Sequence, residues 1–393
     1  MRIAFIAPYQ GPSLLVRRPI RRNLALAGNL KIELVAKLLS GQGHDLEVLS
    51  QGEVVDYSLD YFPAFEETTR FDASIPVYYA SSLPWRYANG WWSANRLRRL
   101  LELRHRRSAF DLVVVYNLKQ PQVACAVYSM EHLALPVVLE FEDDLFVDVH
   151  GKDSRRLRDV NHWRRARKVL DRVSGCVAVS PHLLSRLPSE VPSLLVRGIV
   201  GEDLVSGPGV AEAPKKNRVL YSGTFAENKG LVQLIEAWRI AGLSGWELHI
   251  AGDGIMRDRL SQLASSSAGI VFHGLLSRGD LVQLLSTARI GINPHDVSAT
   301  PGNVFAFKIV EYLAAGAHVI STRMGPVESE LEQGVTYLSD NRPETIAQTL
   351  RRVVSSGAYQ NCADRAALHL YGAKAVGLAL DGLLRRATLR FEV

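Results

Sequence analysis

The sequence has very few cysteines and no long hydrophobic run. Its three cysteines, Cys125, Cys176 and Cys362, are odd in number and lie far apart. They therefore predict neither a disulfide framework nor a zinc cluster, and they favour a reducing compartment. Nowhere do about 18 apolar residues run together, which argues against a membrane-spanning helix. The apolar start is too short for the core of a signal peptide, so we expect a first buried strand and a cytoplasmic protein.

The length and composition predict a two-domain globular protein. The chain of 393 residues is about two and a half times as long as a typical domain, so two domains, each with its own core, are expected. Apolar residues make up 47% and charged residues 22%, which excludes disordered and coiled-coil classes. The chain is therefore able to bury a large core.

The net positive charge is confined to the first half of the chain. Acidic and basic residues balance beyond residue 200, so residues 1–200 carry the whole formal net charge of +6. Arginines cluster at 17–22, 96–107 and 155–172. Clustered arginine can neutralise phosphate, but no helix-turn-helix, zinc-finger or RNA-binding motif accompanies it. The sequence therefore predicts no nucleic-acid partner.

One of these clusters, residues 85–107, also contains four large aromatic residues, and we call it the aromatic-basic segment. Apolar groups beside arginines are typical of a segment that enters the headgroup region of an anionic membrane. The alternative is a leucine stripe that faces the core, with a solvated basic face. The residues that we assign to a membrane or acceptor surface are Trp91, Trp92, Arg98 and Arg99.

Short apolar runs alternate with longer segments of helical periodicity, which predicts parallel sheets with helices on both faces. The expected strands are residues 2–7, 45–49, 112–116, 136–140, 176–180, 219–222, 247–251, 270–273, 290–293 and 318–321, with helices over 30–39 and 155–173 among others. The fold class is α/β, with two doubly wound domains that face each other across a cleft. We place the domains at 1–197 and 217–365, a linker at 198–216 and a C-terminal helical segment at 366–393 that packs on the first domain.

The second half has two candidate ligand-binding features. In SGTFAENKG, Gly223 follows a strand and Lys229 lies at the start of a helix, where an anion is favoured. A phosphate could bind there, although strand-glycine-helix junctions are common. Further on, Glu311 lies within an apolar helix face and needs a partner, because a buried unpaired charge is costly. It either forms an ion pair with Lys308 or accepts hydrogen bonds from the hydroxyls of a ligand.

Taken together and in this order, these segments resemble the retaining GT-B nucleotide-sugar glycosyltransferases, in particular family 4. The second half carries SGTFAENKG, AGDG, FHG, NVFAFKIVE and AAGAHVIST at the places of the family's motifs. The start of the chain, GQGHDLEVLS and VSGCVAVSPHLLSRL are similar to the family's first domain. The resemblance covers nearly the whole chain.

The resemblance implies roles for individual residues. Lys229 would hold the donor diphosphate and Glu311 would accept hydrogen bonds from the ribose hydroxyls. Backbone N–H groups would face the phosphates or the sugar, and the end of one strand would border the base. The implied donor-binding residues are Gly223, Thr224, Lys229, Gly274, Leu275, Asn303, Phe305, Ala306, Phe307 and Glu311.

This sequence departs from the family pattern at three of these positions. Asn303 stands where the family has a glutamate that contacts the sugar, Thr224 where it has an arginine, and Ala306 where it has a glycine. An amide can still exchange hydrogen bonds with a sugar, so we expect an altered sugar preference. Without the arginine, Lys229 is expected to be the main side-chain charge on the diphosphate, unless an arginine from elsewhere replaces it.

An acidic stretch in the first half, FEDDLFVD, follows a predicted strand. The resemblance places Asp143 where the family has a histidine near the transferred sugar, so Asp143 could hold an acceptor hydroxyl or stabilise a cationic transition state. Two alternatives are a metal-binding carboxylate pair and an ion pair with Arg155 or Arg156. We expect Asp143, Lys229 and Glu311 to be the catalytic residues.

The sequence is thus interpreted as a glycosyltransferase that moves a sugar from a nucleotide donor to a saccharide acceptor. The expected acceptor is a lipid-linked saccharide of the kind used in bacterial surface polysaccharides. Retention of configuration and independence of metal ions and cofactors are expected. A GT-B sugar-nucleotide 2-epimerase and a binding protein without catalysis remain alternatives. The expected location is the cytoplasm, with peripheral attachment to the inner face of the membrane as an option.

Overall fold

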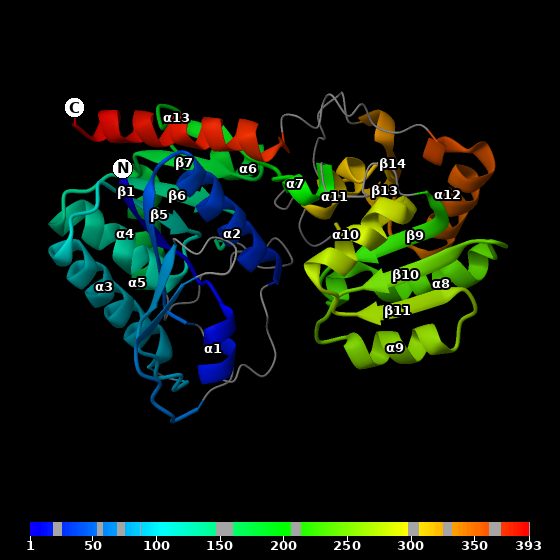
Figure 1. The fold of residues 1–393 in the computed structure, drawn as a ribbon, viewed down its shortest axis with the longest axis horizontal. Helices are drawn as coiled ribbons and strands as arrows, with labels where there is room; N and C mark the ends of the chain where they lie inside the picture. Colours follow the sequence, from blue (N-terminus) through cyan, green and yellow to red (C-terminus); the bar gives the residue numbers. More distant parts are fainter. Residues whose placement is uncertain are drawn as a thin grey trace. The chain divides into compact units, whose positions relative to one another are not determined.

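The computed structural model describes residues 1–18, 26–52, 58–68, 75–86, 88–146, 160–205, 214–297, 306–324, 332–360 and 371–392. These residues divide into two compact units (Figure 1). Described residues before Arg197, together with those from Val376 onward, form the first unit. Arg197 to Ala375 forms the second unit.

The first unit is built on an eight-stranded sheet in the order β3-β4-β2-β1-β5-β6-β7-β8. All neighbours are parallel except β3 and β4, which pair antiparallel at one edge. The strands are β1 (Arg2–Ile6), β2 (Asp45–Ser50), β3 (Phe65–Thr68), β4 (Pro76–Tyr79), β5 (Leu112–Tyr116), β6 (Val137–Phe141), β7 (Gly175–Ala178) and β8 (Ser193–Leu195).

Helices cover this sheet, and the last one comes from the far end of the chain. They are α1 (Pro12–Arg17), α2 (Leu26–Gly41), α3 (Asn89–Arg107), α4 (Gln120–His132), α5 (Val160–Arg172), α6 (Pro181–Leu184) and α13 (Ala373–Glu392). Asp381 of α13 pairs with His44 at 3.0 Å, and Arg390 donates a hydrogen bond to the carbonyl of Glu190 at 2.6 Å. The C-terminal helix therefore packs on the first unit, as Figure 1 shows in red.

The second unit has a six-stranded, fully parallel sheet in the order β11-β10-β9-β12-β13-β14. The strands are β9 (Lys216–Ser222), β10 (Glu247–Ala251), β11 (Ile270–Gly274), β12 (Ala288–Asn293), β13 (His318–Thr322) and β14 (Val335–Leu338). The helices are α7 (Glu202–Val205), α8 (Leu231–Ala241), α9 (Arg257–Ser265), α10 (Arg278–Thr287), α11 (Lys308–Ala314) and α12 (Pro343–Ser356), with short 3₁₀ turns η2 (Glu227–Lys229), η3 (Glu332–Gly334) and η4 (Ala358–Gln360).

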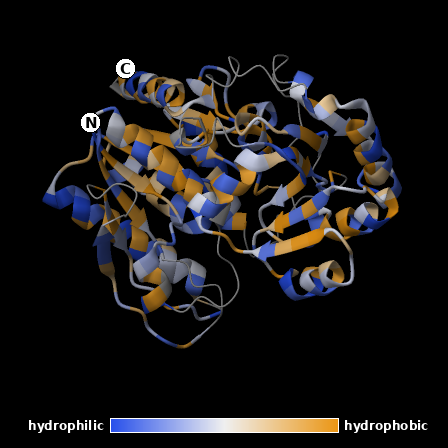
Figure 2. Ribbon diagram, turned by 45° about the vertical axis from the view of Figure 1, so that its right-hand side comes forward, coloured by the Kyte–Doolittle hydropathy of each residue, from blue (hydrophilic) through white to orange (hydrophobic). Residues whose placement is uncertain are grey.

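Each sheet is the centre of its own core, and its inner strands are hydrophobic along most of their length (Figure 2). Strands β5 and β6 are buried at every position. Parallel strands covered on both faces read as continuous apolar runs, which is why the sequence revealed them. The prediction of two Rossmann-like α/β domains is confirmed.

The sequence reading missed four strands, β3, β4, β8 and β14. Strands β3 and β8 contain no buried position, and β4 and β14 are buried at only two of their four positions. Strand β3 alternates between half-buried and exposed side chains at the edge of its sheet. An edge strand has no continuous apolar run, so a search for such runs passes over it.

Candidate active site

The turn after β9 brings two backbone segments into direct contact. Gly223 has φ 140°, a conformation that side chains rarely adopt, and its N–H donates to the carbonyl of Ala251 at 3.0 Å. A Cβ on Gly252, after the neighbouring β10, would collide with the carbonyl of Gly223. The predicted tight turn is present, and its close packing leaves the backbone of Gly223 in a fixed position.

Lys229 lies in η2, just after this turn, and reaches the end of another strand. Its Nζ lies 3.4 Å from Nδ1 of His295, which follows β12. The N-cap of the next helix, Gly230, has φ 68°, and a Cβ there would collide with the carbonyl of Pro294. Because β9 and β12 are neighbours in a parallel sheet, their carboxyl ends place Lys229 and His295 side by side.

We predict that Gly230→Ala destabilises the second unit by about 2–4 kcal/mol. The left-handed backbone alone costs an alanine about 1–2 kcal/mol, and the carbonyl of Pro294 must also move. Gly242→Ala is the matched control, since Gly242 has φ 55° with no atom near its missing Cβ, and should cost only the first of these amounts. Chemical denaturation compares the two; equal losses would mean that the contact with Pro294 is unimportant.

His295 is a member of this site that the sequence reading missed. It is buried, and burial together with the positive charges of Lys229 and Lys308 lowers its pKa to about 3. The imidazole is therefore neutral at pH 7 and able to accept a hydrogen bond from Lys229. The only sequence signal was a polar Asn-Pro-His run after an apolar strand, which is the usual place of ligand-binding residues in α/β sheets.

Glu311 is buried in α11 and is held by an arginine from the preceding helix. Nη1 of Arg278 donates to Oε1 of Glu311 at 2.8 Å, and Nε of Arg278 donates to Asp203 at 2.7 Å. The alternative ion pair between Glu311 and Lys308 is therefore wrong, because Arg278 is the partner. Burial raises the pKa of Glu311 above its ordinary value, although Arg278 opposes this shift.

The other predicted donor residues surround the same edge of the sheet. Gly274 ends β11 with φ 66°, its carbonyl accepts from the N–H of Gly252 at 2.7 Å, and Leu275 beyond it is exposed. Thr224 is exposed in the turn, and its carbonyl accepts from the hydroxyl of Tyr221 at 2.9 Å. Ala306 and Phe307 lead into α11, whereas Asn303 and Phe305 lie outside the described residues.

In the first unit, Asp143 is oriented by an asparagine that follows the neighbouring strand. Oδ1 of Asn117 accepts from the backbone N–H groups of Glu142 at 2.8 Å and Asp143 at 3.1 Å. Nδ2 of Asn117 donates to Oδ2 of Asp143 at 3.2 Å. Asn117 itself has φ 60° and was not singled out from the sequence. Its side chain fixes both the backbone and the carboxylate of Asp143.

The neighbouring Asp144 has a structural role. Its Oδ2 accepts from Arg186 at 2.6 Å and lies 3.1 Å from Nε2 of His182. Burial opposes its charge, but these two partners outweigh burial and lower the pKa of Asp144. The expected partners Arg155 and Arg156 lie outside the described residues.

The residues just before Asp143 belong to a buried cluster of charged side chains. Lys31 of α2 pairs with Glu142 and lies 3.8 Å from Oε1 of Glu140. Burial opposes the charge of Lys31, yet the two glutamates outweigh it and raise the pKa of Lys31. Burial also raises the pKa of Glu140 to about 8. The acidic stretch is therefore anchored by one lysine from a distant helix.

Comparison with known proteins shows the family to which the chain belongs. The fold is similar over 98% of both chains to sucrose-phosphate synthase from Thermosynechococcus elongatus, with a TM-score of 0.73 and 15% identity. It is similar to Anabaena HepE in complex with UDP and glucose, with a TM-score of 0.67 and 14% identity over 98% of this chain and 99% of that one. Residues 30–191 match the glycosyl transferase 4-like domain, and residues 216–356 match the glycosyl transferases group 1. The chain belongs to the glycosyltransferases, and its fold is of the GT-B type.

A curated relative of this glycosyltransferase is a GDP-mannose-dependent alpha-(1-6)-phosphatidylinositol dimannoside mannosyltransferase from Mycobacterium tuberculosis. The two sequences are 32% identical over 109 residues. The match covers 28% of this chain and 27% of the relative, so this chain aligns with about a quarter of the relative's length. The 4-like domain match agrees with the resemblance to family 4.

The aromatic-basic segment of the glycosyltransferase divides into bound and exposed side chains. Trp92 donates from Nε1 to the carbonyl of Ser81 at 3.3 Å and packs edge-on against Tyr61. Trp91, in contrast, is 64% exposed. Arg99, about two turns further along α3, is also exposed. Tyr87 lies outside the described residues.

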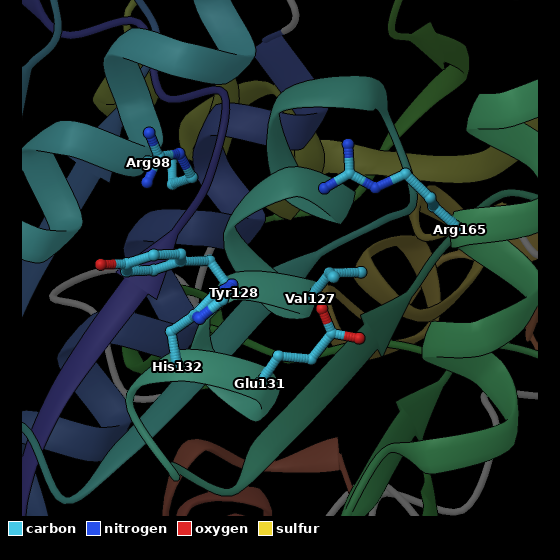
Figure 3. Close-up of a pocket in the computed structure, with 6 residues that line it drawn as sticks. All are labelled: Arg98, Val127, Tyr128, Glu131, His132 and Arg165. Carbon is cyan, nitrogen blue, oxygen red and sulfur yellow. The ribbon is translucent and has the colours of Figure 1, made fainter.

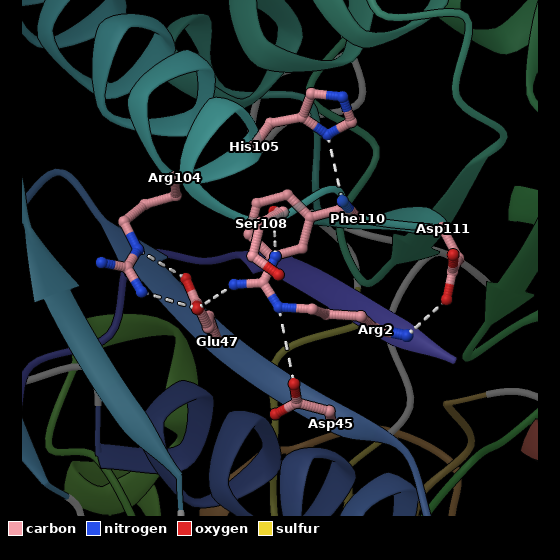
Figure 4. Close-up of polar contacts among 8 residues, drawn as sticks. All are labelled: Arg2, Asp45, Glu47, Arg104, His105, Ser108, Phe110 and Asp111. Carbon is pink, nitrogen blue, oxygen red and sulfur yellow. Dashed lines mark hydrogen bonds and ion pairs between the residues drawn. The ribbon is translucent and has the colours of Figure 1, made fainter.

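Several arginines of this segment have partners within the first unit. Arg98 lies 4.9 Å above the ring of Tyr128 and lines a pocket of about 360 Å³ with it (Figure 3). Arg104 donates to both carboxylate oxygens of Glu47, which also pairs with Arg2 (Figure 4). Leu97 and Leu101 are buried, so the leucine stripe does face the core. Of the four residues assigned to a surface, Trp91 and Arg99 are exposed, whereas Trp92 and Arg98 are half-buried.

The described residues include neither a membrane-spanning helix nor a group of metal-binding side chains. No helix among them is long and apolar enough to cross a bilayer. No three His, Cys, Asp or Glu side chains in the described ranges are grouped as a metal ion would require.

Proposed function

We propose that this glycosyltransferase moves a hexose from a nucleotide diphosphate sugar to a lipid-linked saccharide, with retention of configuration and without a bound metal. The observation that carries the proposal is the joint position of Lys229 and Glu311 at the carboxyl ends of one parallel sheet. A cation there can neutralise the departing diphosphate, and a buried carboxylate can accept hydrogen bonds from ribose hydroxyls.

The charged side chains at the carboxyl edge of the second sheet suit the binding and cleavage of a nucleotide diphosphate sugar. The diphosphate gains negative charge as its bond to the sugar breaks, and Lys229 supplies positive charge where a metal ion would otherwise be needed. Glu311 is oriented by Arg278, so its carboxylate is fixed before a nucleotide arrives. The mycobacterial relative uses GDP-mannose and HepE is seen with UDP, which makes guanine and uracil nucleotides the first donors to test.

The acceptor chemistry is assigned to the first unit. Asp143, held by Asn117, presents a carboxylate that can accept the hydrogen of an acceptor hydroxyl or stabilise an oxocarbenium-like sugar. The relative acts on a phosphatidylinositol dimannoside, a saccharide carried by a lipid. The exposed pair Trp91 and Arg99 is suited to the surface of a membrane in which such an acceptor is held.

A donor and acceptor panel tests this function. The full chain is incubated with GDP-mannose or UDP-glucose, each with EDTA, and with either a polyprenyl-diphosphate-linked hexose or a methyl hexoside. We expect sugar transfer to the lipid-linked acceptor. NMR of the product should show that the anomeric configuration of the donor is retained. Conversion of the nucleotide sugar without an acceptor would support an epimerase instead, and absence of nucleotide binding would support a binding protein without catalysis.

We predict that Trp91→Ala combined with Arg99→Ala weakens binding to anionic vesicles by about tenfold, since one arginine near the surface is worth about 1 kcal/mol and an exposed tryptophan adds to it. The matched control is Ile255→Ala with Arg259→Ala, an equally exposed apolar and basic pair in the second unit. Cosedimentation with vesicles of phosphatidylglycerol and phosphatidylcholine measures both. Equal binding of the two double variants, or no binding by the wild type, would contradict membrane attachment through α3.

A further inference from the structure

We propose that Lys308 is a second cation of the donor diphosphate site and compensates for the uncharged Thr224 in the Gly223 turn. The proposal rests on the proposed function, because it takes the ligand of the second unit to be a nucleotide diphosphate sugar. It adds a binding residue for which the sequence reading offered only an ion pair with Glu311.

The ammonium group of Lys308 lies at the Gly223 turn. Lys308 begins α11, but its Nζ reaches back to the turn after β9, where a Cβ built on Gly223 would lie 2.8 Å from it. The same Nζ lies 3.9 Å above the ring centroid of Tyr221, inside β9. The side chain of Lys308 in α11 therefore brings an ammonium group to the turn in which Thr224 is uncharged.

Lys308 has no acidic partner of its own among the described residues. No carboxylate of the described residues forms an ion pair with Lys308, and Glu311, one turn along α11, is already bonded to Arg278. The positive charges of Lys308 and Lys229 both act on His295, which stays neutral. Two neighbouring ammonium groups in a partly buried site repel each other unless an anion lies between or beside them.

The pKa of Lys308 is lowered when no ligand is bound. Burial and the charge of Lys229 lower the pKa of Lys308 to about 7, while the negative charge of Glu311 opposes this shift. The groups that face it are Lys229, Glu311 and the neutral His295, which in turn interacts with Asp296. A bound diphosphate favours the charged form of Lys308, so binding takes up a proton near and above pH 7.

A titration with and without phosphate groups tests the assignment. The probes are UDP-glucose and GDP-mannose, whichever the wild type binds, and the matching nucleoside, uridine or guanosine. Lys308→Met should weaken binding of the nucleotide sugar about 10- to 100-fold, the effect of one charge-assisted hydrogen bond, and leave the nucleoside unaffected. Lys308→Arg should retain most of the affinity, and Lys216→Met, an exposed lysine at the start of β9, should change nothing.

A second measurement follows proton uptake on binding. Calorimetry of the wild type at pH 7.5 in two buffers of different ionisation enthalpy should show net proton uptake on binding the nucleotide sugar, and its affinity should fall between pH 6.5 and 8.5. Both effects should vanish in Lys308→Met. Unchanged nucleotide-sugar affinity in that variant, or no proton uptake by the wild type, would overturn the role of Lys308. A wild type that binds neither nucleotide sugar would instead remove the proposed function.

Discussion

Replacing Lys229 by methionine should lower kcat for sugar transfer by about 10²- to 10³-fold, the loss expected when one preorganised group that stabilises developing charge is removed. The aliphatic part of the side chain is retained, so the change removes the ammonium group that lies 3.4 Å from His295. Because this charge matters most when the sugar–phosphate bond breaks, kcat should fall more than KM rises. Steady-state kinetics measure both constants, with GDP-mannose or UDP-glucose as the donor, whichever the wild type uses.

Two comparisons make this prediction specific. Lys216→Met removes a lysine from the opposite end of β9, far along the strand from the turn, and should leave kcat unchanged. Lys229→Met combined with Lys308→Met should lose less than the product of the separate losses, because both ammonium groups would act on the same diphosphate. A Lys229→Met enzyme with wild-type kcat would remove Lys229 from the chemistry.

Replacing Lys31 by methionine should destabilise the first unit by about 3–5 kcal/mol at pH 8, the usual cost of removing one partner from a buried ion pair. Glu140 and Glu142 would then be buried without their cation. Lys37→Met, on an exposed position of the same helix α2, is the control and should have little effect. Hydrogen exchange of the β5 and β6 peptides in the full chain reports the free energy of opening of this unit.

The loss in the Lys31 variant should be smaller at pH 5. The pKa of Glu140 is raised to about 8 in the folded protein from 4.5, so folding takes up a proton within this range and stability falls as the pH rises through it. Without Lys31 the carboxylate is even harder to ionise, which makes the variant more sensitive to high pH. Adding Glu142→Gln should restore part of the stability; a variant insensitive to pH would contradict the buried ion cluster.

Much of the fold was readable because its strands are buried on both faces. The predicted strand at 112–116 coincides with β5, which is a continuous apolar run. The predicted strand at 247–251 coincides with β10, which is buried at every position after its first residue. The half-exposed edge strand β3 has no such run, and it was missed. Local patterns therefore determine the inner strands, while edge strands depend on a neighbour with which they pair.

Lys229 and Glu311 drew attention in the sequence because each stands out locally: Lys229 follows a glycine turn, and Glu311 interrupts an apolar helix. Their partners, His295 and Arg278, did not stand out. His295 lies 66 residues from Lys229, and Arg278 lies 33 residues from Glu311. A single sequence carries no record of pairings across such separations.

The sequence by itself determined two α/β domains, a basic first half, and the placement of a lysine, a glutamate and an aspartate after strands of the two sheets. The tertiary structure decided which groups surround them: Asn117 on Asp143, Arg278 on Glu311, and Lys308 at the Gly223 turn. The physical reason is that apolar periodicity is a local property of the chain. Hydrogen bonds and charge interactions at the edge of a parallel sheet instead join residues from separate strands and helices, and they exist only once the sheet has formed.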